Sequence, residues 1–497
     1  MAAAAANLPA SLKTFASRSS RARRPPTGAD RRFAPALLAG LSAIAVFAID
    51  VRAAAGGSRD YDEGVYWLTL RSLAAGHHLY SEIFAAQGPV FFYGLLPVYA
   101  AGHSIAAARV GVAIFSVIAS AAMFVAVSAL AGRWAALASV VLLLTDPIWS
   151  GEALTLHAEV PSLALGLVAL ALTIVASLEV RRPEWLAAGS GAVLGLAVAS
   201  KAFAILFVVP IVLYLVMSRS PARWRNLLVG FAGFVITTLV VFLPFFGDLR
   251  LVYQDLVGLR FGAAHASNAG IGANLHLLHL GRELPLELAA IALAMLALIR
   301  GHRAVIPAAA WVILSGIALL VYQPLFPHEL ALLTVPLAFL AGVALPGLAA
   351  PAGSAGNRRA LEAAAAVGLL LIAGLAGARD LQAWRAATAM DPHEQELAAT
   401  IASHTAPSDL IIGDNPYSIG LAGRGSPPAL VDTSFARIVS RTLTAQTIQE
   451  VAGGGDVTAF VFDTGRLDAV PGLRAWVAGR YPVMEKVGKG TVYLLPR

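Results

Sequence analysis

The chain has 497 residues, of which 58% are hydrophobic and 13% are charged. Soluble domains carry about a quarter charged residues, so the composition excludes an ordinary cytosolic enzyme. The net charge of +7 does not indicate nucleic-acid binding, because the arginines stand in small clusters between apolar runs instead of along one basic face. The absence of cysteine excludes disulfides and cysteine-based metal sites.

The amino-terminal residues 1–32 are rich in Ala, Ser, Arg and Pro and contain no apolar run. We expect a disordered basic tail on the cytoplasmic side, not a cleaved signal peptide. Residues 33–380 then carry recurrent apolar stretches, several of which reach the roughly 20 residues needed to cross a bilayer. The sequence therefore predicts a mainly α-helical, polytopic membrane bundle with about eleven crossings, the last at 360–378.

The basic residues predict the orientation of this bundle, because cytoplasmic loops concentrate Lys and Arg. With the tail inside, every other loop that should also be inside is basic, and these loops carry Arg133, Arg181 and Arg182, Arg219, Arg223 and Arg225, Arg300 and Arg303, and Arg358 and Arg359. The segments expected outside are longest at 52–104 and 247–284. We therefore expect a multi-pass protein of the plasma (inner) membrane, with a cytoplasmic amino terminus.

Residues 385–497 differ in kind and, after an odd number of crossings, should lie outside. Helix-like stretches (His393–His404, Leu443–Ala452, Leu473–Arg480) alternate there with strand-like ones (Leu410–Gly413, Thr458–Phe462, Thr491–Leu495). This pattern predicts a small extracytoplasmic α/β domain. It could bind a partner molecule such as a glycan, or shield a site on the bundle.

Charged side chains at two places in the apolar part cost free energy unless they are paired or hydrated. Asp62 and Glu63 are adjacent carboxylates at a lipid boundary, and such groups should line a water-filled cavity or contact a partner. A solvated helix start capped by Asp62 is the alternative. Lys201 is the only lysine between Lys13 and Lys486 and has apolar neighbours on both sides. It indicates either a binding site or a side chain that snorkels to the interface.

The stretch from Asp62-Glu63 through Leu79-Tyr80 to Gln87-Gly88-Pro89 resembles the first outer loop of the GT-C polyprenyl-phosphate-sugar glycosyltransferases. It is most similar to family 39, the protein O-mannosyltransferases and aminoarabinose transferases, and the resemblance extends through Arg109 over roughly residues 34–345. This resemblance implies a GT-C bundle at 33–380 whose catalytic part includes the loop 52–104.

The resemblance also implies roles for individual residues. Asp62 takes the place of the base that removes the proton of the acceptor hydroxyl, and Glu63 joins it as a second catalytic carboxylate that orients the acceptor or Asp62. Glu159 matches an acidic position of the family, and Lys201 matches a lysine that faces the donor phosphate. Gln87 stands where the aminoarabinose branch has a lysine, so the sugar and the donor contacts stay open.

Four further side chains are weaker candidates. Arg260 could clamp a phosphate or face lipid headgroups, and His328 stands where the family places a basic or aromatic residue near the lipid phosphate. His276 and His279 have a spacing that could ligate a metal, but no third ligand is evident. We therefore expect no cofactor and assign no metal ligands, although the sequence does not exclude a requirement for a divalent metal ion.

Together with the composition, this resemblance implies an inverting glycosyltransferase that moves a sugar from a polyprenyl-phosphate donor to an acceptor hydroxyl on the outer face of the membrane. The acceptor could be a protein, a lipid or a polysaccharide, and neither composition nor motifs indicate nucleic acid. The alternatives are a multi-spanning transporter or lipid flippase, and a scaffold that presents the α/β domain. The enzyme hypothesis requires Asp62, Glu159 and Lys201 to converge on one outward cavity, whereas a scaffold would leave them scattered.

Overall fold

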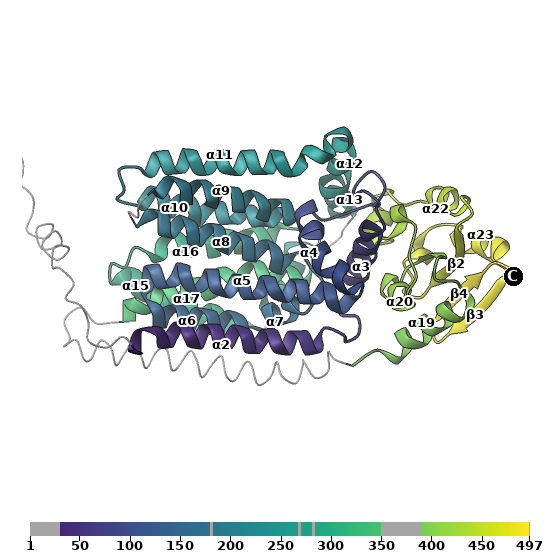
Figure 1. Ribbon diagram of the computed structural model, residues 1–497, viewed down its shortest axis with the longest axis horizontal. Coiled ribbons are helices and arrows are strands. Elements are labelled where there is room, and N and C mark those ends of the chain that lie inside the picture. The colour runs from purple at the N-terminus through teal and green to yellow at the C-terminus, as the bar shows by residue number, and fades with distance from the viewer. Residues whose placement is uncertain (1–29, 179–181, 267–269, 281–283, 349–388, 497) are drawn as a thin grey trace, which may run out of the picture.

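The computed structural model describes residues 30–178, 182–266, 270–280, 284–348 and 389–496. Nearly parallel helices form a bundle, and an α/β part sits at one end of it (Figure 1). The helices before the α/β part are α2 (Asp30–Ala53), α3 (Tyr61–Ala74), α4 (Pro89–Gly102), α5 (Ile105–Ala131), α6 (Arg133–Leu144), α7 (Pro147–Ala153), α8 (Glu159–Ser177), α9 (Pro183–Ser200), α10 (Val208–Met217), α11 (Arg223–Phe242), α12 (Leu249–Tyr253), α13 (Leu259–Ala266), α14 (Ile271–Leu280), α15 (Leu284–Ile299), α16 (Val305–Val321) and α17 (Ala331–Ala344).

Several of these helices are long and apolar enough to cross a membrane. In the described ranges there are five such segments: Phe33–Ala53, Ile105–Ala131, Glu159–Ser177, Arg223–Ala264 and Pro327–Ala344. The pair α6 and α7, bent by 69° at its break, adds a sixth if it is one span. The expected total of about eleven crossings stays a prediction. The crossing expected at 360–378 and most of the tail 1–32 lie outside the described residues.

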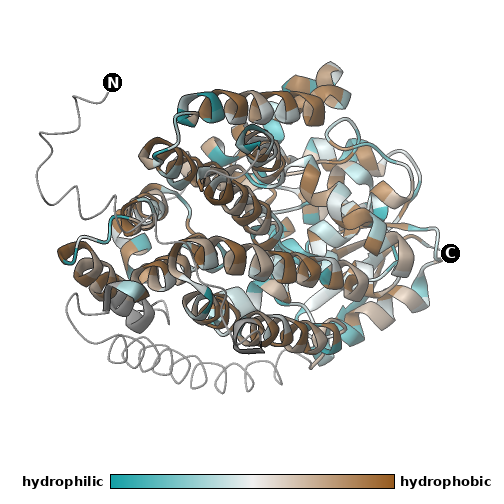
Figure 2. Ribbon diagram, turned by 60° about the vertical axis from the view of Figure 1, so that its left-hand side comes forward, coloured by the Kyte–Doolittle hydropathy of each residue, from teal (hydrophilic) through white to brown (hydrophobic). Residues whose placement is uncertain are grey.

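The helices of the bundle consist largely of hydrophobic residues, which Figure 2 colours brown. In the segment Arg223–Ala264 the most apolar window has no buried residue. Its exposed side chains include Phe231, Leu239 and Phe246, each more than half accessible. A contiguous apolar surface of this length would be unfavourable in water, so these helices face lipid. The protein is a multi-pass membrane protein.

The α/β part contains one small mixed sheet. Its elements are α19 (Pro392–His404), β1 (Leu410–Gly413), α20 (Pro416–Leu421), α21 (Phe435–Val439), α22 (Ala445–Ala452), β2 (Val457–Phe462), α23 (Leu473–Arg480), β3 (Val483–Val487) and β4 (Gly490–Leu494). The strand order is β1-β2-β4-β3, with β1 parallel to β2 and the other pairs antiparallel. Strand β3 was not predicted, because four of its five side chains are exposed and no apolar alternation marks it.

The α/β part packs directly on α3, which lies in the segment 52–104. A Cβ atom on Gly64 would lie 2.4 Å from the backbone nitrogen of Tyr417, so only glycine permits this approach of α20. The Tyr417 hydroxyl donates to the carbonyl of Gly56 at 2.9 Å, which adds a second tie. Helices α3 and α4 and the α/β part therefore share one end of the bundle (Figure 1), as the predicted topology requires. Which side of the membrane this end faces stays a prediction.

Candidate active site

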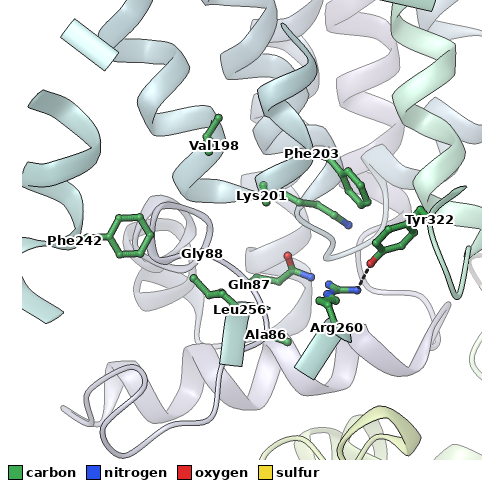
Figure 3. A pocket seen from close by; sticks show the side chains of 11 residues that line it. Ala86, Gln87, Gly88, Val198, Lys201, Phe203, Phe242, Leu256, Arg260 and Tyr322 are labelled. Carbon is green, nitrogen blue, oxygen red and sulfur yellow. Dashed lines mark hydrogen bonds between the residues drawn. The ribbon is translucent and has the colours of Figure 1, made fainter. Parts of the chain in front are cut away.

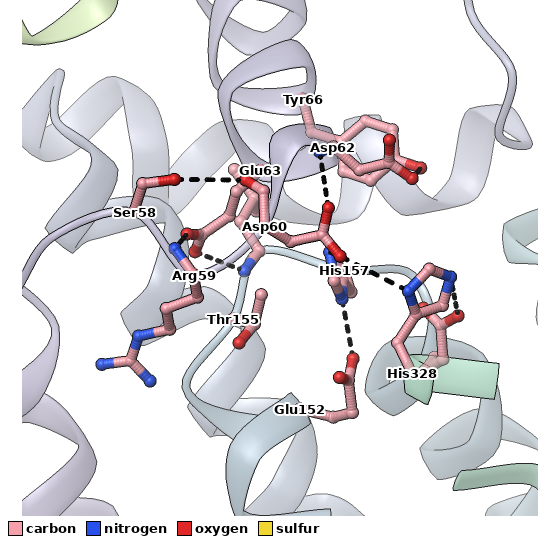
Figure 4. A network of polar contacts seen from close by, with 12 residues as sticks. Ser58, Arg59, Asp60, Asp62, Glu63, Tyr66, Glu152, Thr155, His157 and His328 are labelled. Atoms are coloured by element: carbon pink, nitrogen blue, oxygen red, sulfur yellow. Dashed lines mark hydrogen bonds and ion pairs between the residues drawn. The ribbon is translucent and has the colours of Figure 1, made fainter. Parts of the chain in front are cut away.

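The polar side chains at this end begin with the amino terminus of α3. Asp60 caps the helix, since its carboxylate accepts a hydrogen bond from the backbone N–H of Asp62 at 3.1 Å. The alternative that Asp62 itself is the cap is therefore wrong. The carboxylate of Asp62 instead accepts a hydrogen bond from the Tyr66 hydroxyl, one turn further along, at 3.4 Å and borders a cavity (Figure 4).

Glu63 has no exposed surface and is held by a buried ion pair. Arg109 of α5 donates two hydrogen bonds of 2.6 Å to its carboxylate, and the backbone N–H groups of Arg59 and Leu156 donate to the same oxygens at 3.1 and 2.9 Å. The remaining Arg109 donors bind carbonyls within residues 54–57. Burial alone would raise the pKa of Glu63, but the Arg109 charge lowers it below its ordinary value.

Each oxygen of the Glu63 carboxylate thus accepts two hydrogen bonds. Its carboxylate ties α3 to α5 and to the connection before α8, and it lines neither of the cavities described below. The geometry favours a positioning role for Glu63, and its expected place among the catalytic residues stays a prediction.

A second network surrounds Asp60 and contains two histidines (Figure 4). The Asp60 carboxylate lies 3.8 Å from His157 Nε2 and 3.6 Å from His328 Nδ1. His157 also contacts Glu152 through Nδ1 at 2.8 Å. Burial lowers the pKa of His157, but the Glu152 carboxylate outweighs burial and raises it to about 10. Burial likewise would raise the pKa of Asp60, yet His328 and the charge of His157 bring it to about 2.

Asp60, His157 and His328 could hold a divalent cation. One ligand atom from each lies within 4.8 Å of the others. His157 Nε2 and His328 Nδ1 are buried and have no hydrogen-bond partner, so both nitrogens are available. Two imidazoles and one carboxylate fit a metal that keeps an open position, and His157 would have to lose its proton first. His276, by contrast, is exposed on α14, and the side chain of His279 lies outside the described residues.

Lys201 is not a snorkelling side chain, because it is buried at the end of α9. Its ammonium group donates to the carboxylate of Glu159, which opens α8 and is also buried. The same Glu159 oxygen lies 3.6 Å from Nε2 of His328. Glu159 therefore connects the lysine to the histidine and Asp60 network.

Lys201 borders a cavity of about 160 Å³, here called the lysine cavity (Figure 3). Its walls are mainly apolar, and its polar lining consists of Gln87, Lys201, Arg260 and Tyr322. Arg260 donates to the Tyr322 hydroxyl at 2.8 Å. The cavity thus combines hydrophobic walls with two cationic groups.

A second cavity of about 200 Å³, the aspartate cavity, adjoins the first. The two share Ala86 and Arg260, so one guanidinium borders both. The other polar or charged residues of the aspartate cavity are Asp60, Tyr61, Asp62, Tyr66, His328, Asp432, Ser434 and Arg466. The last three come from the α/β part, and the sequence did not single out these three residues as site candidates.

Gln87 connects the two cavities. Its amide donates to the Tyr66 hydroxyl at 2.8 Å, and that hydroxyl donates to Asp62. Of the seven site residues expected from the sequence, Asp62, Gln87, Arg260, Lys201 and His328 line one or both cavities and Glu159 binds Lys201, while Glu63 lies behind them. The sequence alone predicted no role for Asp60 or His157. Their signals were the Asp60–Asp62 spacing and the alternating polar residues 155, 157 and 159.

Comparison with known proteins agrees with this architecture. Residues 87–247 match the family described as dolichyl-phosphate-mannose-protein mannosyltransferase. The fold is similar to ArnT from Cupriavidus metallidurans, solved with bound undecaprenyl phosphate, with a TM-score of 0.66 and 15% identity over 93% of this chain and 98% of that chain.

Two further structures share the fold with lower TM-scores. The oligosaccharyltransferase of Archaeoglobus fulgidus, solved with a tethered acceptor peptide, gives a TM-score of 0.55 and 14% identity over 87% of this chain and 69% of that one. The mycobacterial arabinofuranosyltransferase AftD gives a TM-score of 0.51 and 15% identity over 95% of this chain and 40% of that chain. No curated protein sequence matches the chain. These likenesses confirm the expected fold class, a helical membrane bundle with a small carboxyl-terminal sheet.

Proposed function

We propose that this chain, a member of the GT-C superfamily of membrane glycosyltransferases, transfers a sugar from a polyprenyl-phosphate donor to an acceptor hydroxyl with inversion at the anomeric carbon. The observation that carries this proposal is the pair of adjoining cavities. One has apolar walls and two cations, the other has the Asp62 carboxylate, and Arg260 borders both.

The lysine cavity suits the phosphate end of a lipid-linked donor. Its apolar walls can contact the first isoprene units, and Lys201 and Arg260 can make charge-assisted hydrogen bonds to the phosphate. ArnT, which has a similar fold, binds undecaprenyl phosphate. Glu159 fixes the position of the Lys201 ammonium, and the neutral Gln87 amide contributes hydrogen bonds without charge.

The aspartate cavity then receives the acceptor. The acceptor oxygen forms a bond to the anomeric carbon as the bond from that carbon to the phosphate oxygen breaks. The polyprenyl phosphate leaves with the bonding electrons, and Lys201 and Arg260 balance its charge. The hydroxyl proton passes to Asp62, whereas the phosphate is a weak base and needs no protonation. A cation held by Asp60, His157 and His328 would add positive charge beside the aspartate cavity.

Asp62→Asn tests this proposal, because the amide keeps the shape of the side chain but cannot accept the proton. With synthetic polyprenyl-phosphate sugars and purified full-length protein, we expect the transfer rate to fall by about 10²- to 10⁴-fold while undecaprenyl phosphate still binds. Glu82→Gln is the matched control, since Glu82 is an exposed carboxylate of the same outer loop and pairs with His77 away from both cavities. Transfer by Asp62→Asn at the rate of the control would contradict the assignment.

A further inference from the structure

A third cavity lies where the α/β part meets the start of α3. It encloses about 280 Å³ and is here called the junction cavity. Among the described residues its acidic lining consists of Asp60, Asp391, Glu394 and Asp463, and its basic lining of Arg59, His393, Arg466 and Lys489. Uncharged amide, hydroxyl and proline side chains complete the wall. The walls of this cavity are therefore polar, unlike those of the lysine cavity.

A hydrogen-bond network centred on Asp463 forms part of the lining of the junction cavity. The Asp463 carboxylate, nearly inaccessible to solvent, contacts Nε2 of His393 at 2.6 Å and accepts a hydrogen bond from the Asn415 amide at 2.8 Å. Strands β3 and β4 turn tightly beside it. A Cβ atom on Gly490 would lie 2.9 Å from Asp463, so glycine is needed to bring the adjacent Lys489 to the cavity wall.

The junction cavity continues into the aspartate cavity. Asp60, Tyr61 and Arg466 line both. The Arg466 guanidinium lies over the Tyr61 ring, 3.8 Å from its centre, and so stands at the boundary between the two spaces. A molecule bound in the junction cavity would therefore have one end near Asp62.

From this chemistry we infer that the junction cavity is a binding subsite for the saccharide portion of the acceptor, an inference that rests on the proposed function. A sugar hydroxyl both donates and accepts, so it can bridge a carboxylate and a neighbouring cation. The cavity lining carries four carboxylates together with Arg59, Arg466, Lys489 and the His393 imidazole. A lipid chain finds no apolar wall here. A peptide acceptor also carries donors and acceptors, and the test below distinguishes it from a saccharide.

The test measures saccharide binding to the full-length protein in lipid nanodiscs. The probes are the methyl glycosides of mannose, glucose, galactose and arabinose, detected by saturation-transfer difference NMR. The double variant Glu394→Gln with Lys489→Ala removes one charge of each sign, and the amide keeps the acceptor that binds the Ser58 N–H. Lys486→Ala is the control, because Lys486 is exposed on the same hairpin outside the cavity.

We expect at least one glycoside to bind the wild type and the control, and to bind the double variant at least tenfold more weakly. Undecaprenyl phosphate, measured separately, should bind all three proteins equally. Absence of glycoside binding to the wild type, or equal binding to the double variant, would overturn the inference. Transfer to a Ser/Thr peptide with the same KM in the wild type and the double variant would also overturn it. Failure of the wild type to bind undecaprenyl phosphate would instead count against the proposed function.

Discussion

Two buried ion pairs at the same end of the bundle differ in what else surrounds them. The carboxylate of Glu63 receives two hydrogen bonds from Arg109 and two from backbone N–H groups, and the pair lines no cavity described here. The pair Glu159 and Lys201 is equally buried, but Lys201 borders the lysine cavity and Glu159 lies beside His328.

This difference separates a structural pair from one that can respond to a ligand. A buried carboxylate whose hydrogen-bonding positions are all occupied cannot also bind a substrate. Removing its partner leaves an uncompensated buried charge. A buried cation on a cavity wall can instead transfer part of its interaction to an incoming phosphate. The predictions below test whether the two pairs behave differently.

Arg109→Ala should have the largest effect on folding. It leaves the Glu63 carboxylate buried without its partner, and such losses cost about 3–5 kcal/mol. Thermal unfolding in detergent should therefore show a large destabilisation. Arg225→Ala is the control, because Arg225 pairs with Glu184 on the surface, where a pair contributes about 0–1 kcal/mol. Equal unfolding temperatures of the two variants would contradict a structural role for the pair of Glu63 and Arg109.

Lys201→Met should act mainly on donor binding. A hydrogen bond to a charged group contributes about 1.5–3 kcal/mol, so undecaprenyl phosphate should bind about 10- to 100-fold more weakly. His328 remains 3.6 Å from Glu159 and can compensate part of its charge, so the unfolding temperature should fall less than for Arg109→Ala. Titration of both variants with undecaprenyl phosphate measures the contrast. Unchanged affinity in Lys201→Met would place the phosphate elsewhere.

Tyr66→Phe should have the smallest effect. It removes the hydroxyl that joins Gln87 to Asp62 but leaves the carboxylate in place. Loss of a neutral hydrogen bond is worth about 0.5–1.5 kcal/mol, so kcat should fall about 2- to 10-fold with donor affinity unchanged. Steady-state kinetics separates these two quantities. A loss as large as that of Asp62→Asn would mean that Tyr66 takes part in the chemistry itself.

The sequence predicted much of the fold because its signals are local. Apolar length marked the long helices such as α5 and α8, and short strand-like stretches between turns marked β1, β2 and β4. Strand β3 carried no such mark, because its side chains are mostly exposed and its position depends on pairing with β4. Several expected crossings fall on shorter apolar helices, such as Val305–Val321, and helix length alone does not identify these as membrane spans.

The candidate site was only partly predictable for the same reason. Asp62 and Lys201 are unusual where they stand, so composition singles them out. Asp60 and His157 are ordinary in their local context, and their contact joins positions 97 residues apart that only the folded chain brings within 3.8 Å. The contribution of Arg466 depends on the docking of the α/β part against α3, which no local pattern indicates.

The position of the phosphate in a structure of this protein with bound undecaprenyl phosphate tests the central claim most directly. We expect its oxygens to lie within hydrogen-bond distance of Lys201 and Arg260, with Asp62 facing the site from the adjoining cavity. A phosphate bound away from both cations, or separated from Asp62 by the bundle, would contradict the account.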